Sequence, residues 1–166
     1  MASLKTLQGT NLDVDLDSIS ELKRAQVDGL GDTSAGDHGE VYQFVQFVDI
    51  DVSAGDSVEI SALSYDADGS INTFQVTADS SAALGDSGIG IAVASVTAGN
   101  YGWIQISGPI AGMNTANTTL TAGDYFRVDG TNDGEIASVA AGEELQALGI
   151  ITEFNTTTAA GILRRF

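Results

Sequence analysis

Apolar and polar residues alternate along short segments of the chain, and Gly, Asn or Asp separates one segment from the next. Alternation with a period of two is typical of β-strands, and Gly, Asn and Asp between such segments indicate tight turns. The pattern predicts strands at residues 41–50, 57–65, 71–78, 89–96, 101–107, 125–129, 135–139, 149–154 and 161–166.

The first of these segments, residues 41–50, is apolar on both faces, with Phe44 on one face and Val45 and Phe47 on the other. A strand that is apolar on both faces is typical of a central position between two layers. Short strands that recur every 8–12 residues or so favour a sandwich or a barrel. We therefore expect an all-β fold, a compact β-barrel or β-sandwich of short antiparallel strands.

Residues 1–40 differ from the rest, and we expect them to form an N-terminal arm ahead of a β-domain at residues 41–166. Segment 13–17 alternates Asp with apolar residues, as an edge strand does. Residues 18–27 are the best helix candidate, because Ser stands where a helix is commonly capped. The arm is expected to contain at most one short helix.

One turn pattern recurs: an apolar residue, a small residue, Ala-Gly, and then an acid or an amide. The Gly supplies a positive φ, and the side chain that follows can bond to nearby backbone. The copies are separated unequally, which argues against a solenoid of fixed period. They lie at residues 52–56, 96–100, 120–124 and 139–143.

Charge narrows the choice of partners. The formal net charge is −17, and residues 25–163 hold 19 acidic residues and one basic residue, Arg127. Such a body repels phosphate backbones, so nucleic acid is not an expected partner. No apolar run approaches the roughly 20 residues that span a bilayer, so a membrane is not expected either. One interpretation of the acidic body is a solubilising surface.

A second interpretation is that basic termini dock onto a partner while the acidic body faces solvent. Apart from Arg127, the basic residues lie near the two ends of the chain. Arg and aromatic residues are enriched in interface anchors, which makes the terminal ones candidates for a contact surface. The candidates are Lys5, Lys23, Arg24, Arg164, Arg165 and Phe166.

The motifs that imitate catalytic or metal sites are incomplete. Gly85-Asp86-Ser87-Gly88 matches the serine loop of chymotrypsin-like proteases, but only 49 residues separate it from His38, too few for two barrels. Residues 129–135 imitate half of a calcium loop, with Ala140 where a bidentate Glu is needed. One His and no Cys leave no zinc ligand set. We expect no catalytic residue, no metal, no cofactor and no enzymatic activity.

Tyr101 and Trp103 share one face of an expected strand because they are two residues apart. Two rings on one face fit a stacking platform for sugars, although a single Trp on an alternating strand more often packs in a core or an interface. Both residues are candidate interface residues. A carbohydrate-binding or adhesive β-domain of a virion or extracellular appendage is the alternative function.

Two stretches resemble a known family. Residues 98–108 (Ala-Gly-Asn-Tyr-Gly-Trp-Ile-Gln-Ile-Ser-Gly) resemble the Gly-x-x-Gly-Trp-Val-Gln-Val-x-Gly strand of the small decoration proteins of tailed-phage heads. Residues 148–151 and 158–164 are similar to the carboxyl-terminal strands and the Ala-rich link of that family. The resemblance covers about residues 89–166, and residues 1–88 show no pattern of the family.

The resemblance implies a structural protein that binds the outside of an HK97-type phage capsid and cements the shell. The implied partners are the major capsid protein and further copies of the chain, in a homotrimer or a homodimer, the trimer being favoured. The implied location is the capsid exterior of the virion, and the host cytoplasm during assembly. Many weak contacts repeated over the shell would then resist internal pressure.

Overall fold

The computed structural model describes residues 30–65, 67, 69, 71–81, 88–115 and 119–164. These residues form an all-β structure without an α-helix, which confirms the expected fold class, and no helix among them is long and apolar enough to cross a membrane. The edge strand and the helix expected within residues 13–27 lie outside the described residues. The elements are β1 (Thr33–Ala35), β2 (Val41–Phe47), β3 (Ser57–Tyr65), β4 (Ile71–Thr77), β5 (Gly88–Ala92), β6 (Tyr101–Asn114), β7 (Tyr125–Val128), β8 (Ile136–Ser138), the 3₁₀ turn η2 (Glu144–Gln146), β9 (Gly149–Asn155) and β10 (Thr158–Leu163).

Five strands close into a barrel in the order β2-β4-β3-β5-β6, because β6 also pairs with β2. One pair in this barrel is parallel, since the β3–β4 hairpin places β4 rather than β3 beside β2. The expectation of antiparallel strands therefore fails at this one pair. The apolar side chains that point into the barrel form its core, which includes Val45, Phe47, Val58, Phe74, Val76, Ala92 and Ile104.

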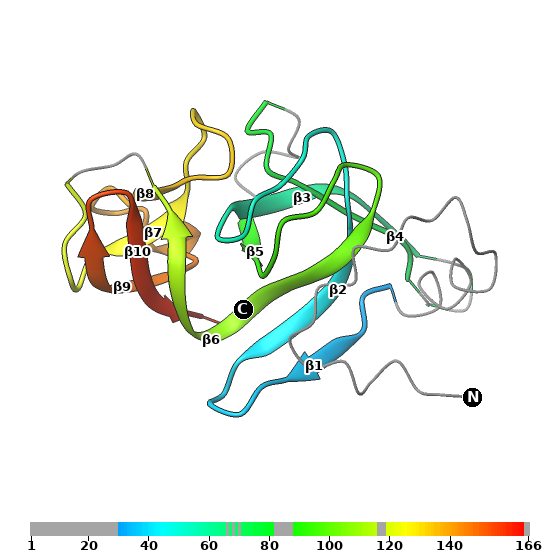
Figure 1. Ribbon diagram of the computed structural model, residues 1–166, viewed down its shortest axis with the longest axis horizontal. Coiled ribbons are helices and arrows are strands. Elements are labelled where there is room, and N and C mark those ends of the chain that lie inside the picture. The colour runs from blue at the N-terminus through cyan, green and yellow to red at the C-terminus, as the bar shows by residue number, and fades with distance from the viewer. Residues whose placement is uncertain are drawn as a thin grey trace.

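A second sheet shares β6 with the barrel and has the order β6-β10-β9-β7-β8. Figure 1 shows β6 running from the barrel, on the right, into this sheet, on the left. The second sheet has its own core, to which Ile91 of the barrel strand β5 also contributes. The other buried members of this core are Met113, Leu120, Phe126, Val128, Ile136, Leu148, Ile151, Ala159 and Leu163.

Strand β6 is longer than the expected segment 101–107, because Gly108 does not end it. Gly108 is followed by Pro109, and this pair is normally a turn signal. In the structure Gly108 has a φ of 91° and the strand continues to Asn114. A Cβ at this position would stand 2.7 Å from the Cα atom of Glu40. The glycine therefore lets the strand change direction against the loop before β2, where it leaves the barrel.

The recurring Ala-Gly turns behave as the sequence predicts. Their glycines, at positions 55, 99, 123 and 142, have φ values of 90°, 89°, 97° and 97°. In each turn the residue after Gly donates its backbone N–H to the carbonyl three residues earlier, at 3.1 Å. In the two Ala-Gly-Asp copies the carboxylate accepts a backbone N–H in return, from Ser53 to Asp56 at 2.7 Å and from Thr121 to Asp124 at 2.8 Å.

The end of the expected N-terminal arm joins the barrel. Strand β1 pairs with β2 in antiparallel fashion, with Thr33 opposite Gln43 and Ala35 opposite Val41. The carbonyl of Asp32 also accepts the backbone N–H of Phe44, at 2.9 Å. Within residues 30–40, β1 is therefore a short strand added to the barrel beside β2.

Candidate functional site

Tyr101 and Trp103 lie on the outer surface of the barrel, where β6 pairs with β2. Phe44 stands opposite Trp103, and the neighbouring residues Val45 and Ile104 are fully buried in the barrel core. Because side chains alternate between the two faces of a strand, Phe44 and Trp103 point outward. The alternation in the sequence correctly predicted that Tyr101 and Trp103 share a face.

Phe44 packs against both of these rings. Its ring centroid lies 6.0 Å from that of Tyr101, in a stacked arrangement, and 5.2 Å from that of Trp103, in a tilted one. Such aromatic pairs contribute about 0.5–1.5 kcal/mol beyond the area they bury. Phe44 is buried, whereas Tyr101 and Trp103 keep part of their surface exposed. Loss of solvent around the phenol raises the pKa of Tyr101.

Val93 extends this aromatic surface. Its backbone N–H donates to the carbonyl of Trp103 at 3.2 Å, and 42% of its surface is exposed. We call Val93, Tyr101 and Trp103, together with the Phe44 beneath them, the aromatic patch. It is an apolar surface held in place by the paired strands β2 and β6, and it suits a packing contact with another protein.

Arg164 is the one terminal candidate among the residues that the structure describes. Its guanidinium lies over the ring of Tyr125, with 4.8 Å between the guanidinium carbon and the ring centroid. The Nη2 atom donates to the Tyr125 hydroxyl at 3.3 Å, and the backbone N–H donates to the carbonyl of Leu148 at 2.8 Å. Arg164 belongs to the second sheet and is not part of the aromatic patch. The other terminal candidates, Lys5, Lys23, Arg24, Arg165 and Phe166, lie outside the described residues.

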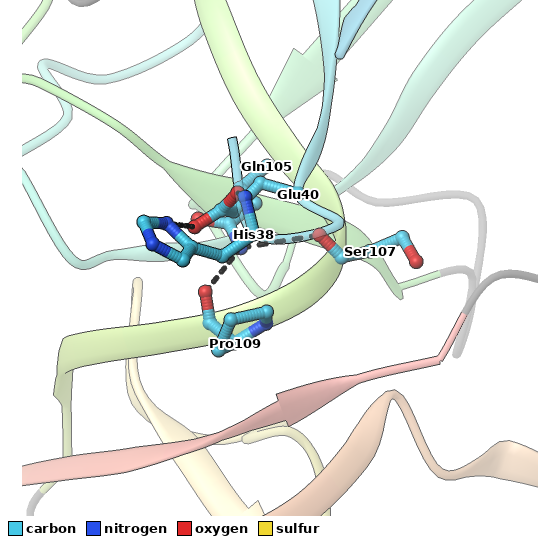
Figure 2. Close-up of polar contacts among 5 residues, drawn as sticks. All are labelled: His38, Glu40, Gln105, Ser107 and Pro109. Carbon is cyan, nitrogen blue, oxygen red and sulfur yellow. Dashed lines mark hydrogen bonds and ion pairs between the residues drawn. The ribbon is translucent and has the colours of Figure 1, made fainter. Parts of the chain in front are cut away.

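His38 lies in the loop before β2, beside the bend of β6 (Figure 2). Its backbone N–H donates to Oε2 of Glu40 at 2.7 Å, and its Nδ1 atom lies 3.7 Å from Oε1. The imidazole is 81% exposed. Ser87 lies outside the described residues. Among the described residues, the polar side chain that contacts His38 is therefore Glu40, in the same loop.

Figure 2 also shows Gln105, which spans the bend of β6. Its Nε2 atom donates to the carbonyl of Ser107 at 3.1 Å and to that of Pro109 at 2.7 Å. Gln105 is buried, so these two bonds satisfy an amide NH2 group that would otherwise be costly to bury. The sequence held no signal for this role, because Gln105 stands at an ordinary outward position of an alternating strand.

The carboxylate of Glu40 is the group in this loop whose charge is favoured by its surroundings. Hydrogen bonds from the backbone amide of His38 and from its own amide lower the pKa of Glu40 below 4.5, and the nearby imidazole adds to the effect. Because the pKa is lowered in the folded state, the carboxylate stabilises the fold above pH 4.5 and loses this effect as the pH falls through the lowered value.

Glu40→Gln should therefore lower the melting temperature at pH 7. The deficit should shrink as the pH falls below 4.5, because the parent protein then loses its own carboxylate charge. Thermal unfolding of both proteins followed by circular dichroism between pH 7 and pH 3 measures this difference. A deficit that stays constant over that range would contradict a charge effect at Glu40.

The acidic loop that imitates a calcium site folds as a turn. Asp129 Oδ1 accepts the backbone N–H of Thr131 at 2.9 Å, and Oδ2 accepts from the Asn132 amide at 2.7 Å. The backbone N–H of Asp129 donates to the carbonyl of Glu135 at 2.8 Å. The Asp129 carboxylate is thus used within its own turn. Among the described residues no three His, Asp or Glu side chains gather closely enough to hold a metal ion.

The described residues thus present the aromatic patch on the barrel and a basic side chain, Arg164, on the second sheet. A comparison of the chain with protein-family models, with curated proteins and with solved structures finds no match.

Proposed function

We propose that this chain is a structural protein without enzymatic activity that binds the outer surface of an HK97-type phage capsid and stabilises the shell. The proposal starts from residues 98–108 and from residues 148–151 with 158–164, which resemble two stretches of capsid decoration proteins. In the fold the two stretches meet at the bend of β6, because the pairing of β6 with β10 begins at Gly108, the last residue of the first stretch. Leu163 of the second stretch stands opposite Gly108 of the first. This adjacency is the observation that carries the proposal.

The two stretches therefore act as one unit of structure. The bend at Gly108 joins them, and Gln105 and Glu40 hold that bend from two sides. The aromatic patch lies on the barrel part of β6, and Arg164 lies beside the bend, one residue after Leu163, which stands opposite Gly108. These are the contacts we assign to the shell.

The charge of the chain suits the outside of a particle. A body with 19 acidic residues against one basic residue between positions 25 and 163 stays well solvated. In this proposal the partner is the major capsid protein, and the chain acts as a homotrimer or homodimer on the capsid exterior, with the host cytoplasm as its location during assembly. Weak contacts repeated over the shell add up to a strong total effect.

A reconstitution experiment tests the proposal. Heads of the phage whose genome encodes this chain are prepared with its gene deleted, and purified protein is added. We expect saturable co-sedimentation and a higher temperature of head disruption. Trp103→Ala should weaken binding by about tenfold or more, as removal of an aromatic interface anchor does. Leu145→Ser serves as the matched control, because Leu145 is 96% exposed and lies outside the aromatic patch.

Heads that neither bind the protein nor gain heat resistance would overturn the proposal. Reproducible binding to a glycan array that Trp103→Ala abolishes, in the absence of head binding, would replace it with the carbohydrate-binding function.

A further inference from the structure

The loop between β7 and β8, residues 129–135, contains two Asp-Gly pairs, Asp129-Gly130 and Asp133-Gly134. Among aspartyl dipeptides, Asp-Gly rearranges to isoaspartate most readily without an enzyme. The reason is that glycine has no side chain to shield its backbone nitrogen from the preceding carboxyl group. The two pairs share this local chemistry, so a difference in reactivity between them must come from the fold.

The rearrangement needs only water. First the glycine nitrogen attacks the side-chain carbon Cγ of the aspartic acid; a C–N bond forms, the nitrogen loses its proton, and the carboxyl hydroxyl leaves as water. Water then opens the resulting succinimide ring. Addition at the former α-carbonyl breaks its bond to the nitrogen and leaves isoaspartate, with the main chain running through Cγ, whereas addition at Cγ restores aspartate. The first step requires the glycine nitrogen to turn toward Cγ, so it depends on the freedom of the backbone there.

The fold holds Asp133-Gly134 in place through bonds to the barrel. The Gly134 N–H donates to the carbonyl of Ala78 at 2.9 Å, and the Gly134 carbonyl accepts the N–H of Ser57 at 2.7 Å. Oδ1 of Asp133 accepts the backbone N–H and the hydroxyl of Ser80, both at 3.0 Å. Gly134 is also buried. Closure of the ring would break several of these bonds, so this pair is protected from the rearrangement.

None of these constraints acts on Gly130. It is exposed, and a Cβ there would meet nothing within 4 Å. Its N–H has no hydrogen-bond partner in the part of the chain that the structure describes. The preceding residue is anchored, because the N–H of Asp129 donates to the carbonyl of Glu135 at 2.8 Å. The peptide unit that carries the attacking nitrogen is therefore free to turn while the residue before it stays in place.

The carboxyl group of Asp129 is folded back over this free glycine. Its Oδ1 atom accepts the N–H of Thr131 at 2.9 Å, and its Oδ2 atom accepts the side-chain amide of Asn132 at 2.7 Å. A carboxyl oxygen bonded to the N–H two residues later forms an Asx turn, in which the side chain curls along the following backbone. Cγ of Asp129 and the nitrogen of Gly130 belong to the same hydrogen-bonded ring. The turn thus keeps the two reacting atoms close together.

We propose that Asp129-Gly130 is a site of spontaneous isoaspartate formation in the folded protein, and that the fold protects Asp133-Gly134. The product has one more methylene in its main chain, and its free carboxylate is attached directly to Cα. It therefore cannot keep both bonds to Thr131 and Asn132, and the exposed half of the loop changes with time while the half bound to the barrel does not. This inference does not rest on the capsid proposal.

Incubation of the purified full chain for several weeks at physiological temperature and pH tests the proposal. A protease that cuts before aspartate but not before isoaspartate, followed by mass spectrometry, then measures the two sites separately. We expect isoaspartate to form at residue 129 about tenfold faster than at residue 133, or more. In about 6 M guanidinium chloride the two rates should agree within about twofold, because unfolding removes the bonds that distinguish the sites.

Gly130→Ala is the matched variant, because its methyl group hinders the attack and has open space around it in the fold. The rate at residue 129 should fall by about tenfold and the rate at residue 133 should not change, with folding verified by circular dichroism. Equal rates at the two sites of the folded parent protein, or no isoaspartate at residue 129, would overturn the inference. A preference for residue 129 that persists in guanidinium chloride would do the same, because the sequence and not the fold would then set it. The comparison of folded with denatured parent protein decides the matter even if Gly130→Ala is unfolded.

Discussion

Gly55→Ala is expected to destabilise the protein strongly, by about 3–5 kcal/mol in the free energy of unfolding. The equivalent change in the other Ala-Gly-Asp turn is expected to be mild. Gly55 has a φ of 90°, a conformation that costs an L-residue about 1–2 kcal/mol. A Cβ there would also overlap the carbonyl oxygen of Gly112 in β6. Backbone cannot move aside as a flexible side chain can, so the turn and the strand would have to separate.

Separation would break hydrogen bonds that hold the turn to the end of β6. The backbone N–H of Asn114 donates to the Gly55 carbonyl at 2.9 Å, and its side-chain amide donates to the Ala54 carbonyl at 3.2 Å and to Asp56 at 2.8 Å. Each such bond contributes about 1 kcal/mol, and the groups left without partners cost more when buried. The overlap with β6 should therefore cost more free energy of unfolding than the positive φ of residue 55 alone.

Gly123→Ala is the matched control. Gly123 stands in the same Ala-Gly-Asp sequence, has a φ of 97°, and a Cβ there would meet nothing within 4 Å. It should cost about 1–2 kcal/mol, or about 3–6 °C in melting temperature, against about 10 °C for Gly55→Ala. Equilibrium unfolding in urea measures both values. Equal losses at the two positions would contradict the close approach of Gly55 to β6.

Local patterns predicted the elements of the fold, and long-range pairing decided the rest. Each strand expected within residues 41–166 has a counterpart, since alternation depends on residues a few positions apart. The parallel β2–β4 pair and the closure of β2 onto β6 depend on residues far apart in the sequence, which periodicity does not record. The extension of β6 past Gly108 was missed because a glycine followed by proline normally marks a turn.

The candidate surface residues also fall into two groups, those related by spacing within one strand and those brought together only by the pairing of strands. The shared face of Tyr101 and Trp103 follows from their spacing in one strand. The position of Arg164 over the Tyr125 ring does not follow from spacing, because it requires the pairing of β10, β9 and β7. No pattern within a single strand marks these residues as neighbours, and none marked Gln105 as the side chain that spans the bend.

The sharing of β6 between two cores leads to an expected result for unfolding. Phe126 is fully buried in the core of the second sheet, and Phe126→Ala should cost about 3–5 kcal/mol. Strand β6 enters both sheets, and Ile91 of the barrel strand β5 packs in the core of the second sheet. The barrel therefore loses support when the second sheet unfolds, and we expect the two parts to unfold in one cooperative transition.

Trp103 is the only tryptophan of the chain, and it lies on the barrel. Its fluorescence thus reports on the barrel, whereas far-ultraviolet circular dichroism reports on both sheets. With Phe126→Ala, both signals should shift to the same lower urea midpoint, although the substitution lies in the other core. Phe47→Ala, in the barrel core, should produce a coincident shift of similar size. A Trp103 transition that keeps its parental midpoint in Phe126→Ala would mean that the barrel is stable without the second sheet.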